Sequence, residues 1–176
     1  GLQTRVGDLM KAKKGAVVVT DYYGEVLAFY SSPSYDPNIF IKQKMNHELE
    51  FALKDPNLPL FNRVISGKFH PGSVYKPIVA IAALEEGEID ENFTFEDKGS
   101  ITIQTSYGDF TYSNWYFTQY GSTEGKIDLT RAIARSTDTF FYEIGEMVGI
   151  DDLNFWSKKF GLDKESGIDL TGEIPG

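Results

Sequence analysis

A serine and a lysine at Ser-x-x-Lys spacing, Ser73 and Lys76, form the strongest chemical pattern in the sequence. Pro71-Gly72 favours a turn directly before Ser73, and an apolar helix is predicted to follow. The first N–H groups of a helix lack intrahelical partners and lie at the positive end of its dipole, which favours a developing oxyanion. A serine hydroxyl needs an adjacent base to become a nucleophile, and Lys76 would lie on the same face. Acyl transfer is one interpretation; the alternative is that Ser73 is only a helix N-cap.

A second polar group, Ser136-Thr137-Asp138, interrupts two apolar stretches of helical spacing. Ser136 could relay a proton to Lys76, and the Asp138 carboxylate could hold either a substrate amide or the lysine. The alternative is again local, because Ser and Asp commonly end one helix and cap the next.

Other kinds of site have little support. The two histidines, His47 and His70, lie in no nucleophile-elbow pattern, and the chain has no cysteine. No metal-binding or nucleotide-binding motif occurs, so we expect neither a metal nor a cofactor. The net charge of −9 argues against nucleic-acid binding, which needs a basic surface. The longest apolar run, Ile78 to Leu84, is far shorter than the roughly 20 residues of a membrane span, so we expect any anchor to lie outside these residues.

The elements that would position these residues mix helices and strands. We expect an amphipathic helix over 4–14, a hairpin from Gly15–Val19 and Val26–Tyr30, and a short helix over 45–54. The helix around Lys76 should run from about 73 to 86 and be largely buried. Its apolar residues recur at intervals of three or four: Val74, Ile78, Ile81 and Leu84.

The amino-acid composition changes in the second half of the chain. Residues 92–120 are rich in Thr, Tyr, Phe and Ser, which predicts extended structure or a small hairpin, and we expect the aromatic residues of 115–120 to be core packing rather than a groove. Helical spacing returns from Leu129, breaks at 135–138 and again at Gly149, and the tail from 167 is irregular.

The stretch Phe69-His-Pro-Gly-Ser-Val-Tyr-Lys-Pro77 resembles the penicillin-binding proteins, in which an aromatic residue precedes Pro-Gly-Ser-x-x-Lys-Pro. Three further stretches resemble the transpeptidase domain of class B members, in the same order: 15–38, Asn62-Arg63 and 166–173. Asp138, where most of the superfamily has Asn, resembles the elongation-type penicillin-binding protein 2 subgroup.

The resemblance implies an α/β (α+β) fold of the penicillin-recognising serine transpeptidase and β-lactamase type, with an antiparallel sheet and a helical subdomain. The family's third motif, Lys-Thr-Gly, does not occur in the sequence. We therefore expect residues 1–176 to be a partial transpeptidase domain, truncated before that motif and inactive by itself.

The resemblance also implies roles for individual residues. Ser73 would be the acylated nucleophile, Lys76 its activating partner, Ser136 a catalytic serine of the second motif, and Asp138 a substrate-binding residue. Some members of the subgroup carry Cys at the middle of the second motif and bind zinc nearby. Thr137 occupies that position here, so we expect no zinc.

The function implied is peptidoglycan D,D-transpeptidation, which cross-links stem peptides during cell elongation and is the target of β-lactams. Expected partners are stem peptides, β-lactams and the glycosyltransferase and scaffold proteins of the elongation machinery. The expected location is the bacterial inner membrane, with the catalytic domain in the periplasm. The alternatives are a D,D-carboxypeptidase or serine β-lactamase-like hydrolase, and a non-catalytic β-lactam sensor or scaffold.

Overall fold

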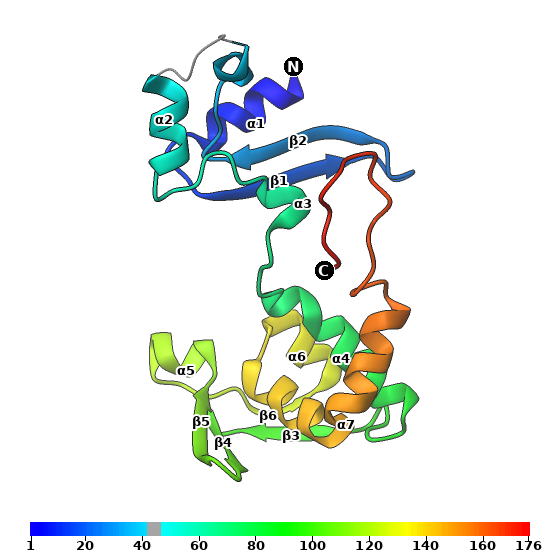
Figure 1. Cartoon of the computed structure of the whole chain (residues 1–176). Helices are drawn as coiled ribbons and strands as arrows, with labels where there is room; N and C mark the ends of the chain where they lie inside the picture. Colours follow the sequence, from blue (N-terminus) through cyan, green and yellow to red (C-terminus); the bar gives the residue numbers. More distant parts are fainter. Residues whose placement is uncertain (42–46) are drawn as a thin grey trace. The chain divides into compact units, whose positions relative to one another are not determined.

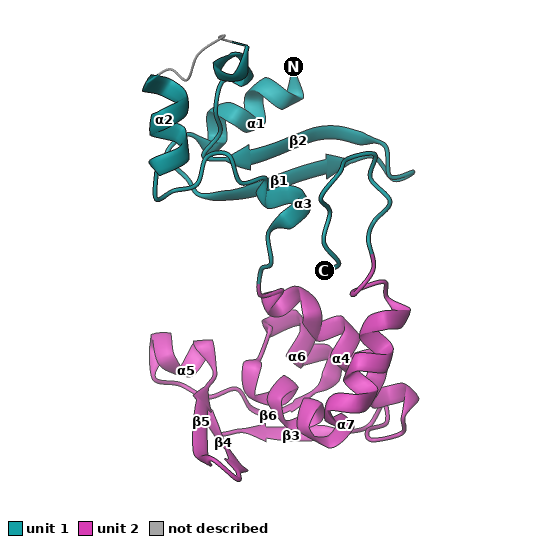
Figure 2. Cartoon of the chain, in the orientation of Figure 1, with its two compact units in different colours: residues 1–69, 165–176 teal, residues 70–164 magenta. Residues whose placement is uncertain are grey.

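The computed structural model describes residues 1–41 and 47–176. These residues form two compact units (Figure 2). Unit 1 comprises Gly1–Phe69 and Glu165–Gly176, and unit 2 comprises His70–Lys164. Every residue of the Ser73 and Ser136 motifs belongs to unit 2.

Unit 1 is built on an antiparallel hairpin of β1 (Gly15–Thr20) and β2 (Val26–Ser32). The helix α1 (Leu2–Met10) packs against β2, where the Gln3 side chain donates to the Phe29 carbonyl and accepts from the Phe29 N–H, each at 2.8 Å. The remaining helices of this unit are η1 (Pro37–Phe40), α2 (His47–Lys54) and α3 (Arg63–Ser66) (Figure 1).

The predicted hairpin of unit 1 is confirmed, with strands slightly longer than expected. The first helix ends at Met10 rather than near residue 14, because Lys11 turns to ψ 132 and Ala12 adopts φ 61. The short helix predicted over 45–54 is present from His47 onward, and residues 45 and 46 lie outside the described residues.

Unit 2 combines three main helices with short strands (Figure 1). The helices are α4 (Lys76–Glu85), preceded by the 3-10 turn η2 (Gly72–Tyr75), α6 (Leu129–Arg135) and α7 (Asp138–Lys159). Two antiparallel pairs accompany them, β3 (Thr94–Asp97) with β6 (Gly125–Asp128) and β4 (Ser100–Thr105) with β5 (Gly108–Ser113), and a short helix α5 (Trp115–Tyr120) follows β5.

The core of unit 2 lies where α4 and α7 pack together above β3 and β6. Phe140 of α7 is fully buried, and its ring meets Phe93, Phe95 and Phe141 edge-on at centroid distances of 5.5–6.0 Å. Three alanines of α4 lie in the same cluster, and their small side chains allow α4 to approach α7 closely.

The apolar face predicted for the 73–86 helix, which began at Val74 and ended at Leu84, is wrong in detail. Val74 is 77% exposed and Leu84 40% exposed, whereas Val79 and the alanines are buried. For Val74 the reason is that residues 72–75 form a 3-10 turn with three residues per turn, so this side chain does not continue the face of the α-helix.

The hairpin predicted within 92–120 is confirmed as β4–β5, whereas β3, β6 and α5 were not individually predicted. The predicted break at Gly149 is also confirmed, because this residue adopts φ 78 and ψ 165 inside α7 and divides it into two helical segments. Residues 167–176 contain neither helix nor strand, as expected.

We predict that Phe140→Ala lowers the free energy of unfolding by about 3–5 kcal/mol, because it leaves a cavity in the aromatic cluster that the neighbouring rings cannot fill. Urea denaturation of the variant and the parent measures this difference. Tyr107→Ala, at a position 93% exposed in the β4–β5 turn, is the control and should change stability by less than about 0.5 kcal/mol. Equal losses in the two variants would contradict this description of the core.

Candidate active site

Ser73 lies in η2, where its side chain is exposed. Gly72 before it adopts φ 61, a conformation that glycine reaches without steric cost. The α-helix itself begins at Lys76, with Pro77 in its first turn, where proline is tolerated. The structure therefore places Ser73 in a short turn that runs directly into α4, and the N-cap of that turn is Pro71 rather than Ser73.

The Lys76 ammonium is held by three acceptors. Its Nζ atom donates to the Ser136 carbonyl at 2.8 Å, to Ser136 Oγ at 3.0 Å and to Asp138 Oδ1 at 2.6 Å. A lysine ammonium has three N–H donors, so all of them are used. The side chain is only 14% exposed, and the Phe141 ring lies 5.4 Å from Nζ as a further favourable contact for a cation.

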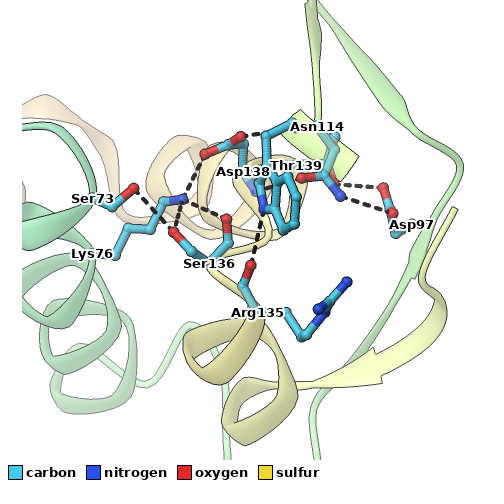
Figure 3. Close-up of polar contacts among 9 residues, drawn as sticks. Ser73, Lys76, Asp97, Asn114, Arg135, Ser136, Asp138 and Thr139 are labelled. Carbon is cyan, nitrogen blue, oxygen red and sulfur yellow. Dashed lines mark hydrogen bonds and ion pairs between the residues drawn. The ribbon is translucent and has the colours of Figure 1, made fainter. Parts of the chain in front are cut away.

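Ser136 joins the lysine to the nucleophile candidate. Its hydroxyl accepts from Lys76 and donates to Ser73 Oγ at 3.0 Å (Figure 3). No hydrogen bond joins Lys76 directly to Ser73 in the part of the chain that the structure describes. The contact expected between Ser73 and Lys76 therefore runs through Ser136.

The backbone holds Ser136 in an unusual conformation. Ser136 ends α6 with φ 54 and ψ 44, in the left-handed region, as the alternative interpretation of a helix-ending serine expected. A residue with a Cβ occupies this region at a cost of about 1 kcal/mol or more. This conformation lets both the carbonyl and the hydroxyl of Ser136 reach Lys76.

Asp138 is the anionic partner of Lys76. Its Oδ1 accepts from Lys76, and its Oδ2 accepts from the Trp115 backbone N–H at 3.1 Å. The alternative that Asp138 caps the helix starting at Thr139 is wrong, because α7 begins at Asp138 itself and both carboxylate oxygens bond outside the helix. Burial, and secondarily the negative charge of Asp138, raise the pKa of the nearby Tyr142.

The sequence did not reveal the residues that surround this loop. Trp115 and Tyr116 were expected in the core, but they are only half-buried and stack against Arg135, whose guanidinium carbon lies 5.4 and 4.9 Å from their ring centroids. Trp115 Nε1 also donates to the Arg135 carbonyl at 2.9 Å. Asn114 is fully buried, and its Oδ1 accepts from the Asp138 N–H at 3.2 Å. A lone Asn before an aromatic run gives no spacing signal.

The remaining polar groups do not extend the site. Both His47 and His70 are exposed. Within residues 1–41 and 47–176, no group of three or more histidine and carboxylate side chains is placed to hold a metal ion. Among the helices that the structure describes, none has the length and hydropathy needed to cross a bilayer.

Hydrogen bonds therefore connect the Lys76 ammonium to the Ser136 hydroxyl, and the Ser136 hydroxyl to the hydroxyl of the exposed Ser73. This arrangement matches a nucleophile with its base, and residues 15–176 match the family model described as "Penicillin binding protein transpeptidase domain". The chain belongs to this family.

Similar proteins agree with this assignment. The peptidoglycan D,D-transpeptidase MrdA of Escherichia coli (strain K12) is 40% identical over 176 residues, which cover 99% of this chain and 27% of that protein. The chain therefore spans 27% of the length of that relative.

Two solved structures are similar in fold. The complex between penicillin-binding protein PBP2 and MreC from Helicobacter pylori gives a TM-score of 0.85 at 30% identity, covering 99% of this chain and 31% of that chain. The penicillin G acyl-enzyme complex of penicillin-binding protein A from M. tuberculosis gives a TM-score of 0.78 at 30% identity. The match covers 92% of this chain and 37% of that chain. These neighbours confirm the expected mixed α/β fold class.

We predict that Ser136→Gly is more stable than Ser136→Ala by about 1 kcal/mol, the reverse of the order of these residues in a helix interior. Both variants lose the same hydroxyl contacts, so the comparison isolates the left-handed backbone at this position. Urea denaturation of the pair measures the difference. An alanine variant as stable as the glycine variant would show that Ser136 carries no backbone strain.

Proposed function

We propose that this chain carries the acylation site of a peptidoglycan D,D-transpeptidase, in which Ser73 is the nucleophile, Lys76 the base and Ser136 the proton relay between them. The observation that carries the proposal is the continuous contact from Ser73 Oγ through Ser136 Oγ to Lys76 Nζ. The similarity to MrdA of E. coli supports transpeptidation over the hydrolase and sensor alternatives.

The reaction begins with a neutral Lys76 amine. The chain of donors then reverses, so that Ser73 donates to Ser136 and Ser136 donates to Lys76. Ser73 Oγ attacks the carbonyl carbon of the D-Ala–D-Ala bond while its proton moves to Ser136 and the Ser136 proton moves to Lys76. The C–N bond then breaks as the D-alanine amine takes the proton from Lys76 by way of Ser136, so Lys76 is neutral again and Ser73 remains acylated.

The second half of the reaction reverses these roles. An amine of a neighbouring stem peptide attacks the acyl-serine carbonyl and gives up a proton to Lys76 by way of Ser136. The ester bond to Ser73 then breaks, and the proton returns along the same path to Ser73 Oγ. The three acceptors around Lys76 stabilise the ammonium that forms while the tetrahedral intermediate of each half exists. A β-lactam acylates Ser73 in the same way. The amine released when its ring opens stays attached to the acyl group, so it does not leave the site and the adduct persists.

We propose Asp138 as the residue that holds Lys76 and borders the substrate. One of its oxygens is bonded to the ammonium and the other to the Trp115 N–H, while the side chain keeps 23% of its surface exposed. Substrate contact at Asp138 would use this exposed surface.

The biological setting follows from the same similarity. The H. pylori neighbour is a complex of PBP2 with MreC, and the M. tuberculosis neighbour is a penicillin G acyl-enzyme, which supports scaffold proteins and β-lactams as partners of this protein. We propose stem peptides and glycosyltransferases as further partners from the family alone. A periplasmic catalytic domain on an inner-membrane anchor fits this role. Since the chain spans 27% of MrdA, we propose that residues 1–176 are part of a transpeptidase domain and do not turn over substrate alone.

We predict that Ser73→Ala abolishes covalent labelling of the intact protein by a fluorescent penicillin, because it removes the attacking oxygen. Gel fluorescence, followed by mass spectrometry of the labelled peptide, measures the adduct. Ser106→Ala, in the β4–β5 turn, is the matched control and should label normally. Labelling that survives Ser73→Ala would refute the proposed nucleophile.

We predict that Lys76→Ala reduces the acylation rate by about 10²–10⁴-fold while the protein stays folded, because the relay through Ser136 then ends at no base. Stopped-flow fluorescence gives the rate, and circular dichroism checks the fold. Lys126→Ala, at an exposed position of β6, is the control. Acylation of the Lys76 variant at the parent rate would remove Lys76 from the role of base.

A further inference from the structure

A buried carboxylate lies behind the Ser136–Asp138 loop and takes no part in the relay. Asp97, the last residue of β3, is 1% exposed. Its Oδ1 accepts from Thr139 Oγ1 at 2.7 Å and from the Gly99 N–H at 2.9 Å. Its Oδ2 accepts from Asn114 Nδ2 at 3.1 Å (Figure 3). The same oxygen also accepts from the Glu124 N–H at 2.8 Å. All its partners are donors, which is the environment of an ionised carboxylate.

The charge of Asp97 is supported by its surroundings. Burial alone would raise the pKa of this carboxyl, but the hydrogen bonds from Glu124, Thr139, Gly99 and Asn114 together outweigh burial and lower it. An ionised carboxylate offers only acceptors, so it fixes which end of the Asn114 amide faces it. The Nδ2 end points to Asp97, which leaves Oδ1 free to accept from the Asp138 N–H at 3.2 Å.

Asp97 is thereby connected to the lysine-binding carboxylate by several short routes. Asn114 holds the Asp138 backbone, and the next residue, Trp115, donates its N–H to the Asp138 side chain. Thr139, which Asp97 binds directly, is adjacent to Asp138 in the first turn of α7. Figure 3 shows Asp97, Asn114 and Thr139 next to Asp138, which in turn contacts the Lys76 ammonium.

We propose that Asp97 is a positioning residue for the acylation step, which orients Asp138, and through it Lys76, by way of Asn114 and Thr139. The inference rests on the function proposed above. Asp97 touches neither Ser73 nor Lys76, so it acts on the reaction only through the geometry of these neighbours.

The test is Asp97→Asn in the intact protein. An amide at position 97 accepts on one side only, so two of the four donors lose their acceptor and the Asn114 amide is no longer held in one orientation. We expect the acylation rate constant for a fluorescent penicillin to fall about 10- to 100-fold, with little change in the dissociation constant of the preceding complex. Stopped-flow measurement over a range of penicillin concentrations separates the two constants.

Two further variants separate positioning from stability. Thr139→Val keeps the charge and the core volume, removes one donor to Asp97, and should lower the same rate constant by a smaller factor even if Asp97→Asn does not fold. Val148→Ala is the control, because this buried residue of α7 loses packing without touching the network and should leave the acylation rate unchanged. A parent-like rate constant in both network variants, or an equal fall in Val148→Ala, would overturn the proposal.

Amide hydrogen exchange gives a readout that does not depend on activity. In Asp97→Asn, or in Thr139→Val if the former does not fold, the Asp138 and Trp115 amides should lose protection at least tenfold while amides within α4 keep theirs. Unchanged protection at Asp138 and Trp115 would overturn the positioning role. If the parent protein formed no adduct at Ser73, the proposed function would fail, and hydrogen exchange would still decide the role of Asp97.

Discussion

The site depends on the attachment of one ammonium group to three oxygen atoms. Lys76 Nζ binds the Ser136 carbonyl, the Ser136 hydroxyl and the Asp138 carboxylate, and two of these acceptors belong to a residue whose backbone is left-handed. A largely buried ammonium needs such partners, because burial without them would be very costly. The same partners fix the direction of the Ser136 hydroxyl, which then reaches Ser73.

This attachment requires three helix ends that are far apart in the sequence to be held close together in space. Lys76 begins α4, Ser136 ends α6 and Asp138 begins α7, and α4 packs on α7 through alanines and the buried Phe140 cluster. On the opposite side of the loop, Asp97 gathers donors from four segments of unit 2. An apolar core on one side and a satisfied polar network on the other leave the loop few alternative conformations.

Much of this arrangement was predictable from the sequence, and the exceptions have physical causes. The Ser-x-x-Lys spacing, the turn at Pro71-Gly72 and the polar interruption at Ser136 were visible because local chemistry determines them. The role of Ser136 as a proton relay was one interpretation of the sequence, but the sequence did not reveal that the contact between Ser73 and Lys76 runs through Ser136, because this depends on how α4 and α6 pack and on the φ of 54 at Ser136. The contribution of Asn114 was hidden for the same reason, since a buried amide is recognised by its partners rather than by its spacing.

The central claim is that the Ser73 proton reaches Lys76 through Ser136, so two protons move in the acylation step. The most direct test is the acylation rate of the intact protein by a fluorescent penicillin in mixtures of H₂O and D₂O. If both protons move together, a plot of the acylation rate against the deuterium fraction will bow below the straight line that joins its two end points. A straight line would indicate a single proton in motion and would contradict the relay through Ser136.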